Sequence, residues 1–399
     1  MANEVEKMKP MCKWLMTGMC IFLIQQPVHA QGMNETRQVA LENKELPASV
    51  PRFVFDSGLK FDYPDAVRGI YVTGPAAGGN KLNELIKYVD ETDLNAMVID
   101  IKDDKGNVTY KTEDPDSPYA GIGKDYIKNP RAMLKKFEDK QIYPIARVVV
   151  FKDSLLAKEK PELSFLDGEK VWKNGRGEAF VNPFLKEVWD YNVGIAIEAA
   201  KMGFKEIQFD YVRFPEGFEN KEDDLKYDVG EYDEAKMSHT AKRVQAVTDF
   251  VSYARKQLEP YDVEVSVDIF GYAATLPEAP GIGQNFTKIS ENVDVISSMI
   301  YPSHWTSYFG IEKPDLEPYN LVKEYAKLEN GKLKELKTPP TSRPWLQDFT
   351  ASYLGDGNYQ RYGKEEVEAQ IKALNDNGID EYLLWNAANR YTKGVDYTP

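Results

Sequence analysis

The chain has 399 residues, of which 42% are hydrophobic, with a formal net charge of −14 and a sequence isoelectric point near 5.0. With a mean hydropathy of −0.52, this composition is typical of a soluble globular protein with a buried core. Nucleic-acid grooves need clustered basic residues, so we predict no nucleic-acid partner. Anionic membranes are disfavoured for the same reason.

Residues 1–30 have the pattern of a secretory signal peptide. A charged stretch ends at Lys13, an apolar run covers 14–24, and the small-residue sequence 28–30 predicts cleavage after Ala30. The run is shorter than the roughly 20 residues that cross a bilayer as a helix, although an uncleaved anchor is the alternative. We therefore predict a secreted or extracytoplasmic protein with no stable membrane insertion after leader removal.

Both cysteines, Cys12 and Cys20, fall in this leader together with His29, so the predicted mature chain keeps only His239 and His304. Cysteine nucleophiles, disulfides and sites built from several histidines are thereby excluded. The chain also lacks a phosphate loop, a Gly-x-Gly-x-x-Gly motif and a Gly-x-Ser-x-Gly motif. We predict no cofactor, and chemistry based on carboxylates and aromatic rings.

From residue 67 onward, eight β-branched runs alternate with helical patterns, as in repeated βα units. The predicted strands are 67–73, 96–101, 142–150, 206–212, 263–269, 293–301, 344–349 and 381–385. Helical patterns lie near 80–93, 129–140, 184–202, 239–258, 315–328 and 364–377, with a weak one over 270–290. Residues 31–66 are predicted to be a linker or an N-terminal wrap. Eight strands over 67–399 predict an α/β fold, a (β/α)8 TIM barrel with enlarged βα loops. An open doubly wound sheet is the alternative, but it leaves the eighth strand unexplained.

The predicted strand 263–269 alternates between aliphatic and polar residues. Its odd-numbered positions are aliphatic, whereas Glu264, Ser266 and Asp268 share the other face. In a closed barrel the aliphatic face packs on helices and the polar face points into the lumen. A strand between two helix layers would be apolar on both faces. The alternation therefore favours closure.

Two aspartates end neighbouring predicted strands, Asp210 the fourth and Asp268 the fifth. Long connections over 102–128, 151–183, 214–238 and 302–314 also follow predicted strands. These connections and both aspartates belong to the C-terminal mouth, where barrel enzymes carry their sites. Since neighbouring strands lie about 4.8 Å apart, the two carboxyl groups can reach the roughly 5–5.5 Å separation found in retaining glycosidases.

Retaining hydrolysis needs one ionised and one protonated carboxyl group. We predict that Asp210 is the nucleophile, held ionised by Arg213 three residues later. Asp268, followed by Phe270 and Tyr272, is predicted to be the acid with a raised pKa. A purely structural pair of Asp210 with Arg213 is the alternative.

Two more charged residues lie on predicted strands. Asp100 ends the second strand and either binds sugar hydroxyls or forms an acidic turn closed by Lys102. Arg147 lies within the apolar third strand. Because an unpaired buried charge is costly, we expect Arg147 to pair with a carboxylate in the lumen.

Aromatic and amide side chains follow the last three predicted strands. Aromatic faces stack on sugar rings, and amides bind hydroxyl groups. The candidates are Tyr301, His304 and Trp305 after the sixth strand, Gln347 on the seventh, and Trp385 and Asn386 at the end of the eighth. Trp345 is instead predicted to be a core residue.

The connection 214–238 carries nine acidic residues, which we interpret as a solvated loop. A calcium site is the alternative there, although the spacing of an EF-hand is missing. A hard cation held by Asp100, Asp103, Asp104 and Asp268 would instead make the chain a metal-dependent hydrolase or deacetylase.

Five segments together resemble a bacterial glycoside hydrolase domain family without an assigned substrate, related to the α-amylase and α-galactosidase superfamily. They are 67–73, 98–104, the Phe-Asp-Tyr-Val-Arg-Phe-Pro block over 209–215, 267–271 and 299–302. The resemblance spans about 67–390 and implies a TIM barrel with a nucleophile at the position of Asp210. α-Amylases place an arginine two residues before that aspartate, where this chain has Gln208, so their specificity does not transfer.

We therefore predict a secreted, retaining glycoside hydrolase acting on a cell-envelope or extracellular polysaccharide, with Asp210 and Asp268 as catalytic residues and no metal. The predicted substrate-binding residues are Tyr71, Asp100, Arg147, Arg213, Tyr301, His304, Trp305, Gln347, Trp385 and Asn386. A non-catalytic carbohydrate-binding barrel with the same aromatic residues is the alternative.

Overall fold

The computed structural model describes residues 54–112, 115, 117, 119, 121–233, 236–276 and 281–399. The predicted leader and most of the predicted linker lie outside these residues, so both stay predictions. Within the described ranges, no helix is both long and apolar enough to cross a membrane.

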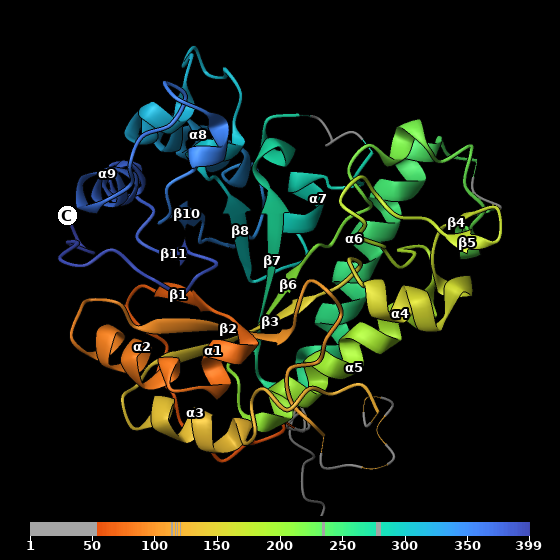
Figure 1. Cartoon of the computed structure of the whole chain (residues 1–399), viewed down its shortest axis with the longest axis horizontal. Coiled ribbons are helices and arrows are strands. Elements are labelled where there is room, and N and C mark those ends of the chain that lie inside the picture. Colours follow the sequence, from red (N-terminus) through yellow and green to blue (C-terminus); the bar gives the residue numbers. More distant parts are fainter. Residues whose placement is uncertain are drawn as a thin grey trace, which may run out of the picture. The chain divides into compact units, whose positions relative to one another are not determined.

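Parallel strands form a closed barrel, which confirms the predicted fold (Figure 1). In order around it are β1 (Arg68–Val72), β2 (Ala96–Lys102), β3 (Tyr143–Val149), β6 (Glu206–Asp210), β7 (Glu264–Phe270), β8 (Val295–Met299), β9 (Thr341–Ser342) with β10 (Trp345–Gln347), and β11 (Tyr382–Trp385). β9 and β10 share the seventh position, because β8 pairs with both and β10 continues to β11. Pro344 lies between them, and proline cannot donate a backbone hydrogen bond to a neighbouring strand.

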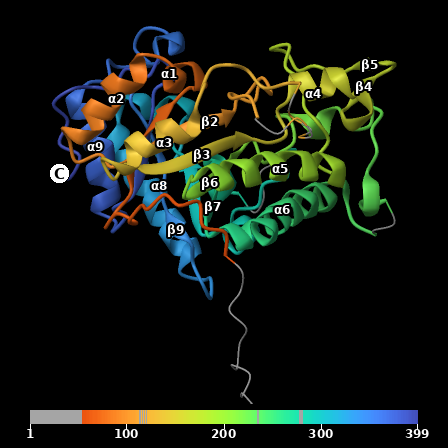
Figure 2. The same ribbon diagram turned by 90° about the horizontal axis from the view of Figure 1, so that it is seen from below.

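Helices surround the strands, as Figures 1 and 2 show from two directions. They are α1 (Gly74–Gly78), α2 (Lys81–Asp90), α3 (Pro130–Glu138), α4 (Ser154–Glu159), α5 (Lys186–Met202), α6 (His239–Leu258), α7 (Phe286–Ser290), α8 (Pro318–Leu333) and α9 (Lys364–Asn375). The long connection after β3 holds α4 and a small hairpin of β4 (Leu166–Asp167) and β5 (Lys170–Val171). The weak helix expected over 270–290 consists of a 3-10 turn and the short α7.

The apolar core has two parts that follow the alternation of the strands. Val265, Val267 and Ile269 of β7 belong to the large cluster between sheet and helices. A smaller cluster, which includes Tyr71, Val98 and Trp345, fills the lumen. The lumen is therefore a packed interior in which polar side chains need partners.

At the N-terminal end of the lumen, Arg343 is completely buried among acidic side chains. Its Nη1 lies 2.7 and 2.6 Å from the two carboxylate oxygens of Glu206, and its Nε lies 2.8 Å from Glu381 Oε2. Its Nη2 donates to the hydroxyl of Tyr63 at 2.8 Å. One guanidinium thus joins the starts of β6, β10 and β11 to the segment that precedes β1.

We expect Arg343→Met to lower the free energy of unfolding by about 3–5 kcal/mol, because the variant leaves Glu206 and Glu381 buried without their cation. Urea denaturation followed by circular dichroism measures this change. The control is Lys60→Met, which removes an exposed ion pair with Asp56 and leaves the denaturation midpoint unchanged. Equal effects of the two substitutions would show that the buried network is not what holds the strand starts together.

Candidate active site

A cavity of about 580 Å³ opens at the C-terminal mouth of the barrel. It lies beyond the ends of β3, β6, β7, β8 and β11, where the enlarged loops begin. Its walls include Tyr71, Arg147, Lys152, Arg176, Glu178, Asp210, Tyr211, Arg213, Glu216, Asp268, Tyr272, Tyr301, His304, Trp305, Trp345 and Trp385. Most of the predicted substrate-binding residues are therefore gathered around both predicted catalytic aspartates.

Asp210 ends β6 and accepts three hydrogen bonds through its carboxylate. Arg147 Nη2 and Nε lie 2.5 and 3.0 Å from Oδ2, and the backbone N–H of Tyr211 donates to Oδ1 at 2.5 Å. Arg147 extends from β3, the strand next to β6. Its guanidinium and the backbone N–H both stabilise a negative charge on Asp210. The expected lumen carboxylate for Arg147 is thus Asp210, together with Asp100.

Phe209 of β6 pairs with Val267 of β7. Asp210 and Asp268 follow one residue later on these strands, so they lie side by side. Only 1% of its surface is exposed, and Oδ1 accepts a hydrogen bond from Trp345 Nε1 at 2.7 Å. Burial first, and the negative charge of Asp210 second, raise the pKa of Asp268 well above its ordinary value. The protonated form of Asp268 is therefore favoured.

Asp100 lies behind Arg147 and is not among the cavity-lining residues. Its two carboxylate oxygens accept hydrogen bonds from Arg147 Nη1 at 2.6 Å and from the Tyr71 hydroxyl at 2.5 Å. Burial raises its pKa to about 6. Lys102 does not close an acidic turn here: its buried Nζ pairs with Asp153 at 2.8 Å. The contacts of Asp100 indicate that it positions Arg147.

Aromatic rings line part of the cavity. Tyr71 and Trp385 stack with ring centroids 4.0 Å apart and planes 17° apart. Tyr272 and Trp305 form a second pair, with centroids 4.2 Å apart. Tyr301, at the exit of β8, is buried beside Asp268 and contacts Trp385. Such faces suit the apolar faces of sugar rings.

Charged side chains from three loops also line the cavity. Lys152 Nζ pairs with Glu178 at 2.7 Å and with Asp104 at 3.1 Å. It also lies 4.7 Å from the ring centroid of Tyr211, and the Arg213 guanidinium lies 4.8 Å from the same centroid. Tyr211 has a backbone φ of 51°, a conformation that residues other than glycine rarely adopt. These two cations hold that turn in place directly after Asp210.

Arg213 does not have the role that the sequence suggested. Its Nη2 pairs with Glu216 at 3.0 Å and its Nη1 donates to the Phe214 carbonyl. The guanidinium beside Asp210 belongs to Arg147 instead. Spacing along the chain favoured Arg213, whereas the barrel brings Arg147 to Asp210 from the neighbouring strand.

Gln347 and Asn386 do not line the cavity, because their amides bind other parts of the protein. Gln347 accepts a bond from the Ser303 N–H and donates to Asp315. Asn386 donates to the carbonyls of Asp348 and Arg390. Both side chains therefore position loops at the mouth.

Sequence reasoning also missed residues that the structure adds to the site. Trp345 was expected in the core and is indeed 1% exposed, but its indole N–H contacts Asp268. Lys152 and Glu178 come from the connection after β3, whose length alone pointed to the mouth.

The acidic residues proposed for a cation do not converge. Asp100 pairs with Arg147 and Asp104 with Lys152, whereas Asp103 accepts bonds from Asn107 in its own turn. Among the described residues, no group of three acidic, histidine or cysteine side chains has the arrangement of a metal site. The carboxyl groups of Asp100, Asp103 and Asp104 thus have separate partners within the protein.

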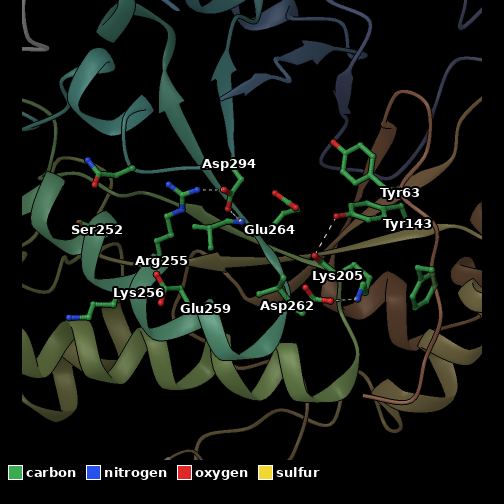
Figure 3. Close-up of a pocket in the computed structure, with 14 residues that line it drawn as sticks. Tyr63, Tyr143, Lys205, Ser252, Arg255, Lys256, Glu259, Asp262, Glu264 and Asp294 are labelled. Atoms are coloured by element: carbon green, nitrogen blue, oxygen red, sulfur yellow. Dashed lines mark hydrogen bonds and ion pairs between the residues drawn. The ribbon is translucent and has the colours of Figure 1, made fainter. Parts of the chain in front are cut away.

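A second hollow, of about 710 Å³, lies at the opposite end of the barrel (Figure 3). There Arg255 pairs with Asp294, Lys205 lies 3.9 Å from Asp262, and burial raises the pKa of Glu264. Barrel enzymes carry their sites at the C-terminal face, not at this one. The aromatic walls and the neighbouring strand-end aspartates also belong to the first cavity.

Over residues 69–391, the chain matches the model of a family described as "Putative glycosyl hydrolase domain". A comparison with curated protein sequences found no match. Among solved structures, the glycoside hydrolase domain of PgaB (BpsB) from Bordetella bronchiseptica aligns with a TM-score of 0.56 and 14% identity, covering 82% of this chain and 95% of that one. This likeness supports the barrel fold.

Two further solved structures have lower TM-scores. A hypothetical protein from Ruminiclostridium thermocellum is 33% identical, with a TM-score of 0.42, covering 50% of this chain and 96% of its own. An α-galactosidase from Thermus thermophilus is 11% identical, with a TM-score of 0.48, covering 84% of this chain and 60% of its own.

We expect Trp345→Phe to raise the pKa of Asp268 further, since the indole N–H stabilises the ionised carboxylate. NMR titration of the 13C-labelled aspartate carboxyl groups measures this shift without a substrate. Trp385→Phe is the control, because that ring packs near the site without a hydrogen bond to Asp268 in the structure. A lowered or unchanged pKa in Trp345→Phe would contradict this role for the indole.

Proposed function

The chain belongs to this family of glycosyl hydrolase domains, and on that premise we propose that it is a retaining glycoside hydrolase with Asp210 as nucleophile and Asp268 as general acid and base. The observation that carries the proposal is the contrast between two neighbouring carboxyl groups. Arg147 and a backbone N–H stabilise the charge of Asp210, whereas burial raises the pKa of Asp268. Glycosidases use such a pair, one carboxyl group ionised and the other protonated.

In the first step, Asp268 donates its proton to the glycosidic oxygen while an Asp210 carboxylate oxygen attacks the anomeric carbon. The bond from that carbon to the leaving sugar breaks, and a covalent glycosyl-enzyme forms. Departure of the leaving group leaves Asp268 ionised. Asp210 loses its negative charge when it is glycosylated, which removes the charge that had opposed ionisation of Asp268.

In the second step, ionised Asp268 takes a proton from water, and the resulting nucleophile attacks the anomeric carbon. The bond to Asp210 breaks, so the sugar keeps its original anomeric configuration. Arg147 stabilises the departing carboxylate through Oδ2. Asp268 ends the cycle protonated, which is the state that its environment favours.

The same cavity offers surfaces for the sugars on either side of the cleaved bond. The Tyr71–Trp385 and Tyr272–Trp305 pairs provide aromatic faces, and the charged side chains around Lys152 provide donors and acceptors for hydroxyl groups. The leader pattern over 1–30 supports a substrate outside the cytoplasm. We therefore propose a cell-envelope or extracellular polysaccharide as the substrate of a secreted enzyme.

We expect Asp210→Asn to abolish release of reducing sugars from the polysaccharide that the wild-type chain cleaves, in a panel of bacterial envelope and extracellular polysaccharides. Asp268→Asn lowers kcat by about 10²–10⁴-fold, because it removes proton donation. Asp268→Asn lowers kcat less with a dinitrophenyl glycoside, because that leaving group departs without taking up a proton. Proton NMR of the first product measures whether the configuration is retained.

The matched control is Glu264→Gln, which changes a partly buried carboxyl group at the opposite end of the barrel and leaves kcat unchanged. Full activity of Asp210→Asn, or product of inverted configuration, would overturn the assigned mechanism. Binding of a polysaccharide without cleavage by the wild-type chain would favour the non-catalytic barrel.

A further inference from the structure

Tyr353 lies outside the cavity, in the 3-10 turn Ser352–Leu354 that follows β10. With 67% of its surface accessible, it is the most exposed large hydrophobic side chain that the structure describes. Single exposed apolar side chains are common on proteins and need no function. Tyr353 differs because its ring is tethered: its hydroxyl donates to Ser303 Oγ at 3.2 Å.

The tether connects Tyr353 to the rim of the cavity. Ser303 Oγ lies 3.1 Å from Nδ1 of His304, an exposed side chain that lines the cavity opening. The ring of His304 lies 5.2 Å from that of Tyr301, inside the cavity. His304 and Tyr353 are thus both held by the same hydroxyl group, Ser303 Oγ, at the rim of the cavity.

A buried amide holds this rim in place. Gln347 Oε1 accepts a hydrogen bond from the Ser303 N–H at 3.0 Å, and its Nε2 donates to Asp315 Oδ1 at 3.0 Å. Asp315 Oδ2 in turn accepts a bond from the Gln360 N–H. The segments after β8 and β10 are thus joined beneath the surface. A ring held in this way loses little conformational freedom when a ligand stacks on it.

An exposed aromatic face such as that of Tyr353 suits a sugar ring, which has an apolar face and polar edges. A small glycoside that fills the cavity would not reach a ring outside it. We propose that His304 and Tyr353 form a distal sugar-binding platform, and that the chain binds an extended polysaccharide running from the cavity across this rim. This inference rests on the proposed function, because it needs a sugar in the cavity.

The test uses the full chain with Asp210→Asn, so that binding is measured without cleavage. Native gels cast with laminarin, hydroxyethyl cellulose, dextran, xylan, galactomannan or partly acetylated chitosan give the affinity for each polymer from the retardation of the protein. Titration calorimetry gives the affinity for the matching trisaccharide. We expect Tyr353→Ala to weaken binding of the retained polymer about three- to tenfold, the effect of one lost stacking contact, and to leave trisaccharide binding unchanged.

Tyr353→Phe keeps the ring and loses the bond to Ser303, so it retains more polymer affinity than Tyr353→Ala. Val54→Ala is the surface control, because it also shortens an exposed apolar side chain but in a different part of the protein. Val54 precedes Phe55, whose N–H donates to the carbonyl of Pro260 in the segment after α6. Equal loss of polymer and trisaccharide binding, unchanged polymer binding in Tyr353→Ala, or no retention by any polymer would each overturn the platform. Failure of the wild-type chain to cleave these polymers would instead count against the proposed hydrolysis while leaving this binding result intact.

Discussion

Arg147 carries a charge into the lumen of the barrel, where an unpaired ion is several kcal/mol less stable than in water. Two carboxylates compensate it: Asp100 on one arm of the guanidinium and Asp210 on the other. Tyr71 fixes Asp100, Asp100 orients Arg147, and Arg147 orients Asp210. The orientation of the proposed nucleophile therefore depends on a chain of buried contacts from three other strands.

The two ends of the lumen use a buried arginine differently. Near the strand starts, Arg343 contacts Glu206, Glu381 and a tyrosine hydroxyl, and both carboxylates have a cationic partner. At the mouth, Arg147 forms ion pairs with Asp100 and Asp210 but none with Asp268 in the structure. The first arrangement joins strands. The second leaves Asp268, with its raised pKa, next to a carboxyl group that has a cationic partner, and the proposed reaction depends on this difference.

The barrel could be predicted because the strands are short runs of β-branched, aliphatic or aromatic residues and because β7 alternates cleanly between aliphatic and polar residues. The aspartates were found for the same reason, since strand ends of a parallel barrel meet at one mouth. Contacts between strands were harder to predict. Arg213 is close to Asp210 in sequence, but Arg147 reaches Asp210 from the neighbouring strand, inside the lumen. Gln347 and Asn386 looked like ligands for hydroxyl groups because nothing in a sequence shows that an amide already has internal partners.

Pro344 divides the seventh strand of the barrel into the short strands β9 and β10. β8 has two registered pairs with β9 and one with β10, against five with β7 on its other side. β8 is therefore joined to the seventh strand by fewer registered pairs than to β7, so local opening of β8 costs less on that side, at the seam with the seventh strand. Trp345 and Gln347 both lie on β10, at the seam. Local opening of this seam would displace both Trp345, whose indole N–H contacts Asp268, and Gln347, whose amide supports the rim. The pKa of Asp268 would then depend on how often the pairing between β8 and β10 opens.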